Sequence, residues 1–197
     1  MAGYGRRRRE RVDHENGFSL LEVLFATALL TVALTGLAQL FIVAARANAS
    51  AKTTTYAAVL AQQKMEQLRG LAYGFDVLGL PVTDTNSDIT VDPVRPAGGT
   101  GLQPSPVGAL GENTVGYVDY LDSNGTSLGG AAAVPPPGAV YIRRWSVERI
   151  PANPNTIVLQ VLVTRARNRA PADSPAGVVT RLPDEARIVS VKTRKAS

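Results

Sequence analysis

The residues whose types and spacing could do chemistry lie near the start of the chain, at Gly17, Phe18 and Glu22. Glu22 is the only charged residue in an apolar run that covers residues 18–45. An ionised carboxylate inside such a run costs about 2.5–3.5 kcal/mol, so it is usually kept for a partner or a function. The run contains no cation, and the free amino group of a neighbouring subunit would serve if the chain were cut just before Phe18. A carboxyl that reaches the membrane interface or stays protonated is the alternative.

The apolar run is long enough to cross a membrane, because a bilayer needs about 20 residues. It is too long for the apolar region of a secretory signal peptide, which has roughly 7–15 residues. The hydrophilic leader at residues 1–17 carries Arg6–Arg9 and Arg11, and clustered arginines favour the cytoplasmic side of a membrane. The sequence therefore predicts a single-pass protein with a cytoplasmic N-terminus and a C-terminal domain outside.

The segment GFSLLEVLFATALL resembles the prepilin cleavage and methylation motif of type IV pilins and type II secretion pseudopilins. The resemblance implies that a prepilin peptidase cuts after Gly17 and N-methylates the new terminus at Phe18. Glu22 would then neutralise the terminal amine of an adjacent subunit during assembly. The implied partners are the peptidase, other pilins or pseudopilins, and an inner-membrane assembly platform.

The same resemblance implies a structural subunit of a bacterial pilus or pseudopilus, held in the inner membrane and able to enter a filament, with its C-terminal domain periplasmic or extracellular. Many major pilins carry a helix-breaking proline midway along this segment, whereas here the first proline after Phe18 is Pro81. This difference favours a minor pilin of the PilV kind, or a pseudopilin. Whether the machine is a pilus, a secretion system or a competence system stays open.

Beyond the membrane run, the sequence divides into a helical, a loop-rich and a strand-rich part. Residues 46–70 are rich in helix-forming residues and end at a glycine, which predicts a continuing helix. Residues 71–138 are rich in Gly and Pro and predict a connecting loop region. Residues 139–197 predict an antiparallel sheet, with strands at 140–150, 156–165 and 186–193. The expected fold class is α+β, with a long N-terminal helix packed on a C-terminal sheet and Trp145 between them.

Smaller features of the loop region and of the helix leave alternatives open. Short strands are expected at 89–91 and 115–121, and Asn124-Gly125 predicts a tight turn, solvated rather than cation-binding. In the helix after residue 45, apolar residues form two stripes. One stripe could hold the chain's own sheet and the other a neighbouring helix, or both could widen one core face. The stripes are Tyr56, Val59 and Leu60, and Ala57, Ala61, Met65 and Leu68.

Composition argues against an enzyme. The chain has no cysteine, and its single histidine is His14, within the leader. A chain cut after Gly17 would therefore lack the commonest general base and the commonest metal ligand. Neither a nucleophile motif nor a phosphate-binding loop is present. We expect no catalytic residues, no metal and no cofactor.

The basic C-terminal third supports a rival function. Its arginines and lysines could bind DNA or another surface, as in a DNA-binding or surface-binding minor pilin of a natural-transformation system. The candidate contacts are Arg143, Arg144, Arg165 and Arg167. Solvent-facing strand positions are also routinely charged, which is the simpler interpretation of the same residues.

Overall fold

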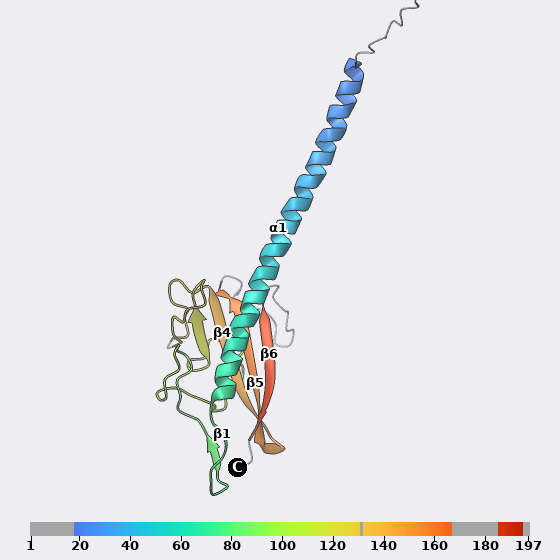
Figure 1. Cartoon of the computed structure of the whole chain (residues 1–197). Helices are drawn as coiled ribbons and strands as arrows, with labels where there is room; N and C mark the ends of the chain where they lie inside the picture. Colours follow the sequence, from blue (N-terminus) through green and yellow to red (C-terminus); the bar gives the residue numbers. More distant parts are fainter. Residues whose placement is uncertain (1–17, 131, 167–184, 195–197) are drawn as a thin grey trace, which may run out of the picture. The chain divides into compact units, whose positions relative to one another are not determined.

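The computed structural model describes residues 18–130, 132–166 and 185–194, and it divides the chain into two compact units, Met1–Ala47 and Asn48–Ser197. One helix, α1, runs over Leu20–Gly70 and contributes to both units. The second unit also contains the strands (Figure 1). The leader with Gly17, and Arg167, lie outside the described residues.

In the first unit, the apolar side chains of α1 are exposed. None of the described residues up to Ala47 is buried, although the segment is long and apolar enough to cross a membrane. Its polar hydroxyls are satisfied within the helix, since Thr31 and Thr35 donate to the carbonyl oxygens four residues earlier at 2.7 and 2.8 Å. A membrane helix must satisfy its polar groups internally in this way. The segment is therefore suited to an apolar surrounding.

In the second unit, four strands form one antiparallel sheet in the order β3-β4-β5-β6. The strands are β3 (Val118–Leu121), β4 (Tyr141–Ile150), β5 (Asn153–Arg165) and β6 (Ala186–Thr193). Trp145 of β4 lies opposite Val161 of β5, and Val161 lies opposite Ile188 of β6. The three longer strands agree with those predicted from the alternation of apolar residues, which confirms the α+β fold class.

The C-terminal part of α1 packs across one face of this sheet (Figure 1). Trp145 is completely buried in the resulting core, as predicted. The helix residues in the core are Ala57, Leu60, Ala61, Met65 and Leu68. Val59 is exposed. The stripe containing Ala57 thus packs on the sheet together with Leu60 and the half-buried Tyr56, whereas Val59 is exposed.

The Gly/Pro-rich region is more ordered than the sequence predicted. It begins with a small hairpin of β1 (Tyr73–Phe75) and β2 (Pro81–Thr83), and it contains β3. The strand predicted at 89–91 is wrong, because Ile89 is a buried core residue next to an isolated bridge between Asp88 and Arg95. Gly130 approaches β3 so closely that a Cβ atom there would lie 1.9 Å from the Val118 carbonyl oxygen. Glycine is therefore required where this region packs on the sheet.

Candidate processing and assembly segment

Phe18 and Glu22 flank the point where α1 begins. Phe18 precedes the helix and is 82% exposed, and the Ser19 carbonyl accepts the first helical hydrogen bond from the Val23 amide at 3.2 Å. Serine is a favoured residue at this boundary. The start of the helix thus leaves Phe18 as an uncovered residue beside the predicted cleavage site.

Glu22 lies in the first turn of α1, and its neighbours along the chain are apolar. The unpaired amide groups of a helix N-terminus favour a negative charge there. None of the ion pairs found among the described residues includes Glu22. The carboxylate is therefore exposed on an apolar helix, available to a cation that another molecule brings.

A second group of charged residues lies in the core of the outer unit, and the sequence did not predict it. Asp119 of β3 accepts two hydrogen bonds from the Arg143 guanidinium, at 2.9 and 2.7 Å. Its Oδ2 atom also lies 2.9 Å from Lys64 Nζ of α1. All three side chains are at most 1% exposed. The cluster joins α1, β3 and β4, so it ties the helix to the sheet through charge as well as through apolar packing.

Lys64 and Arg143 make further contacts inside this cluster. Arg143 donates to the Leu60 carbonyl oxygen at 3.1 Å, and Lys64 donates to the Ile89 carbonyl oxygen. Lys64 Nζ also lies 4.6 Å from the centre of the Trp145 ring. Burial is the main cause that lowers the pKa of the Lys64 amine to about 8, against the opposing attraction of Asp119. Burying Lys64 in its charged form is therefore costly.

Among the described residues, the arginines predicted to contact DNA or another surface do not form a surface patch. Arg143 is held in the cluster, and Arg144 is 2% exposed with its guanidinium bound to Asn113 Oδ1 at 2.9 and 2.6 Å. Arg165 is half-buried, and Arg167 is not described. The prediction of a surface contact is wrong for Arg143 and Arg144, because both guanidinium groups are enclosed and used within the fold.

The sequence did indicate that Arg143 and Lys64 would be buried. Strand side chains alternate between faces, so Arg143 shares the face of Trp145, which the sequence predicted to lie between helix and sheet. In α1, Lys64 lies between Ala61 and Met65 within the stripe that packs on the sheet. A buried cation on each element requires a buried anion nearby. Asp119 supplies it, because it lies opposite Arg143 in the register of β3 and β4.

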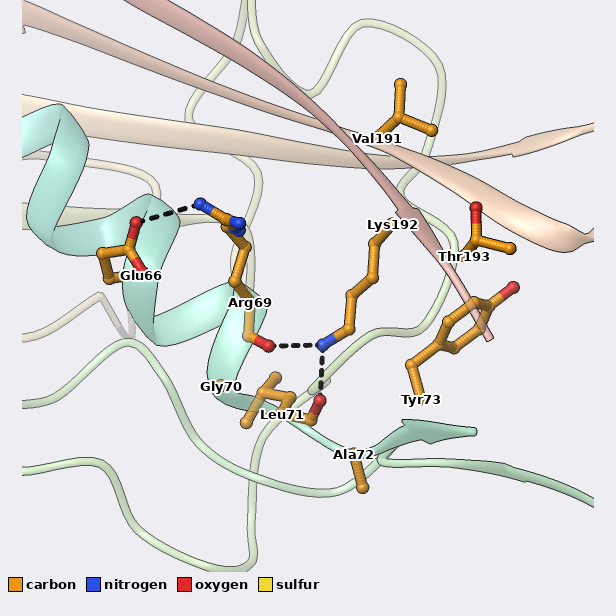
Figure 2. Close-up of a pocket in the computed structure, with 9 residues that line it drawn as sticks. All are labelled: Glu66, Arg69, Gly70, Leu71, Ala72, Tyr73, Val191, Lys192 and Thr193. Carbon is orange, nitrogen blue, oxygen red and sulfur yellow. Dashed lines mark hydrogen bonds and ion pairs between the residues drawn. The ribbon is translucent and has the colours of Figure 1, made fainter. Parts of the chain in front are cut away.

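A cavity of about 600 Å³ lies where α1 ends, between Gly70–Tyr73 and β6 (Figure 2). Lys192 of β6 points into it and donates to the Arg69 and Leu71 carbonyl oxygens at 2.6 and 2.5 Å. It also reaches the Leu68 carbonyl oxygen at 3.3 Å. The last carbonyl groups of a helix lack helical partners and attract a cation. Lys192 therefore caps the helix and is not directed at a ligand.

Comparison with known proteins identifies the N-terminal segment. Residues 13–38 match the family model of the prokaryotic N-terminal methylation motif. No curated protein and no solved structure matches the chain. The chain thus carries the N-terminal segment of a type IV pilin-like protein, which is structural and not enzymatic, and the motif implies processing by a prepilin peptidase and assembly with pilins. Its apolar helix is consistent with a prepilin that spans the inner membrane once.

Proposed function

We propose that this chain is a minor pilin of the PilV kind, or a pseudopilin, that enters a type IV pilus or a type II secretion pseudopilus. The observation that carries the proposal is the uncovered apolar half of α1, with Glu22 in its first turn and the methylation motif around it. This half of the helix is exposed along all of its described residues. Its apolar side chains suit first the lipid and then the helices of neighbouring subunits.

Cleavage after Gly17 creates a positively charged amino terminus that can pair with Glu22. The new amino terminus at Phe18 is a cation, and Glu22 of a neighbouring subunit is an exposed carboxylate on an apolar helix. In a medium of low dielectric constant, an unpaired charge is costly and a matched pair is favoured. Pairing of Phe18 with Glu22 between subunits therefore fixes how far one helix is shifted along the next.

The absence of proline from the described part of α1 supports the assignment to a minor subunit or pseudopilin. Pro81 is the first proline after Phe18, so the helix is not interrupted by a residue that removes a backbone hydrogen bond. In this proposal the outer unit lies on the periplasmic or extracellular side. An assembly platform in the inner membrane inserts the subunit into the filament.

The first test is the mass and N-terminal sequence of the full chain extracted from membranes, made with and without a prepilin peptidase. We expect a chain that starts at N-methylated Phe18 only when the peptidase is present. A Gly17→Ile variant should keep its leader, because a branched side chain blocks close approach to the peptide bond. An intact Met1 terminus in the presence of the peptidase would contradict the proposal.

A second test separates processing from assembly. Glu22→Gln should be cleaved normally and should be lost from sheared filaments, because an amide cannot neutralise the terminal amine of its neighbour. Glu66→Gln is a matched control on the same helix, since Glu66 is an exposed residue paired with Arg69. Equal recovery of both variants in filaments would remove the proposed role of Glu22.

A further inference from the structure

The hairpin that follows α1 ends in an exposed apolar tip. Val77 is 97% exposed and Leu78 is 79% exposed, and Leu80 is exposed as well. We call residues 76–80 the hairpin tip. Single exposed apolar residues are normal on protein surfaces, but a projecting group of three is typical of a surface that binds another protein.

The hairpin tip is held in one conformation. Asp76 Oδ1 accepts hydrogen bonds from the Leu78 and Leu80 amides at 2.9 and 2.8 Å. The Asp76 amide donates to the Leu80 carbonyl oxygen at 2.9 Å, and Gly79 takes the positive φ of 75° that the turn requires. An apolar group that is already ordered loses little conformational entropy when it binds.

Arg194 fixes the base of the same hairpin. Its guanidinium donates to the Gly74 and Val82 carbonyl oxygens at 3.1 and 2.6 Å and to Thr83 Oγ1 at 2.9 Å. It also lies over the Tyr73 ring, 4.2 Å from the ring centre. These contacts join β1, β2 and the chain after β6. The tip is thus a rigid projection of the outer unit.

A shallow apolar groove lies on the opposite side of the helix from the core. Its lining residues are Asn48, Ala51, Lys52, Thr55, Tyr56 and Val59. At 100° per residue, all of these positions except Tyr56 face away from Ala57, Ala61 and Lys64, which contact the sheet. Tyr56 forms one side of the groove and packs against the core. Val59 is 57% exposed in this helix groove. The groove therefore presents Val59 and part of Tyr56 as apolar surface that the described part of the chain leaves exposed.

We propose that the hairpin tip of one subunit packs into the helix groove of a second copy of this chain. The tip is apolar and carries Asp76, and the groove is apolar and carries Lys52, so the two surfaces match in polarity and are opposite in charge. This inference rests on the proposed function, since it describes how outer units of one filament meet.

The two surfaces lie at different levels along the outer unit. The groove lies at the start of the outer unit's helical segment, and the tip lies beyond its end at Gly70. From Val59 to Gly70 the helix rises by about 16 Å, at 1.5 Å per residue. Two different patches that meet can close a two-fold dimer, in which each tip enters the other copy's groove, or they can repeat from subunit to subunit in an open filament. We infer the repeating contact, because the chain is proposed to enter a filament.

Cysteine cross-linking tests this contact directly, because the natural chain contains no cysteine. Two full-length chains with different tags are made together in cells that process the protein. One carries Leu78→Cys and the other Val59→Cys, both at exposed positions. After mild oxidation we expect disulfide dimers that contain one chain of each kind. A chain with both cysteines should give a ladder of dimers, trimers and longer species.

Two controls make the outcome decisive. Val107→Cys replaces Leu78→Cys as a fully exposed cysteine outside the hairpin tip and should lower the mixed dimer at least tenfold. Leu30→Cys in one chain and Leu34→Cys in the other, four positions apart like Phe18 and Glu22, report whether the N-terminal helices of two copies meet. A Leu30–Leu34 dimer without the Leu78–Val59 dimer would overturn the inference and leave the proposed assembly intact. Absence of both dimers would overturn the contact and the self-assembly of this chain together.

Discussion

The two units of the chain differ in which kinds of side chain they bury and which they expose. Before Ala47, large apolar residues such as Leu24 and Leu30 are exposed. After Asn48, the charged residues Lys64, Asp119 and Arg143 are buried. The first unit needs lipid or other helices around it, because exposed apolar surface in water is unfavourable. The second satisfies even its buried charges by itself. One chain thus combines a segment made for assembly with a self-contained folded unit.

We expect the largest loss of stability from removing Asp119, the only anion in the buried charge cluster with Lys64 and Arg143. Asp119→Ala leaves Lys64 and Arg143 as buried cations without a counter-charge, so the free energy of unfolding should fall by about 3–5 kcal/mol. Urea unfolding of the full chain in detergent, followed by the fluorescence of its single tryptophan, Trp145, measures this loss. Glu112→Ala, at an exposed carboxylate, is the control and should change stability by less than about 0.5 kcal/mol. Similar values for the two variants would show that the cluster does not hold the unit together.

The same substitution at two places in one helix sharpens the comparison. Leu60 is 4% exposed in the core, whereas Leu30 lies in the uncovered half of α1. Leu60→Ala should lower the free energy of unfolding by about 2–5 kcal/mol, because it creates a cavity. Leu30→Ala should leave the Trp145 unfolding transition unchanged. A shift of that transition by Leu30→Ala would show that the two units are energetically coupled.

A smaller effect follows from the lowered pKa of Lys64, which is about 8 in the folded chain and 10.5 ordinarily. Between these values the unfolded chain binds a proton that the folded chain does not, so stability rises with pH in this window. From pH 8 to 9.5 this contributes about 1–2 kcal/mol to the natural chain. Lys64→Met removes the contribution, and urea titrations at several pH values measure it. A constant difference between the two proteins over this window would contradict the assignment.

The smallest expected effect is local. Arg194→Ala removes the contacts that hold the base of the hairpin, so amides in residues 73–83 should exchange hydrogen about fivefold faster, equivalent to about 1 kcal/mol. Trp145 fluorescence should report nearly unchanged global unfolding. Arg149→Ala, at an exposed arginine on β4, is the matched control. Faster exchange throughout the sheet in Arg194→Ala would mean that the hairpin is not an independent projection.

The sequence predicted those features that depend on local patterns. The methylation motif is a short contiguous pattern, and the strands around Trp145 and Val161 follow from alternation with a period of two. The hairpin was missed, because strands of three residues show no period and its turn depends on the side chain of Asp76. The ion cluster was missed for another reason. It depends on the register that brings Asp119 opposite Arg143, which are 24 residues apart in the chain.

Two residues that complete the outer unit are made long after the elements that they hold. Lys192 caps the end of α1, and Arg194 holds the hairpin, although both targets are made more than a hundred residues earlier. A ribosome that has not yet released β6 therefore leaves the helix end uncapped and the hairpin loose. The outer unit can reach its final form only after β6 has been made. Chains that lack β6 would expose the junction of helix and hairpin, which Lys192 and Arg194 otherwise hold.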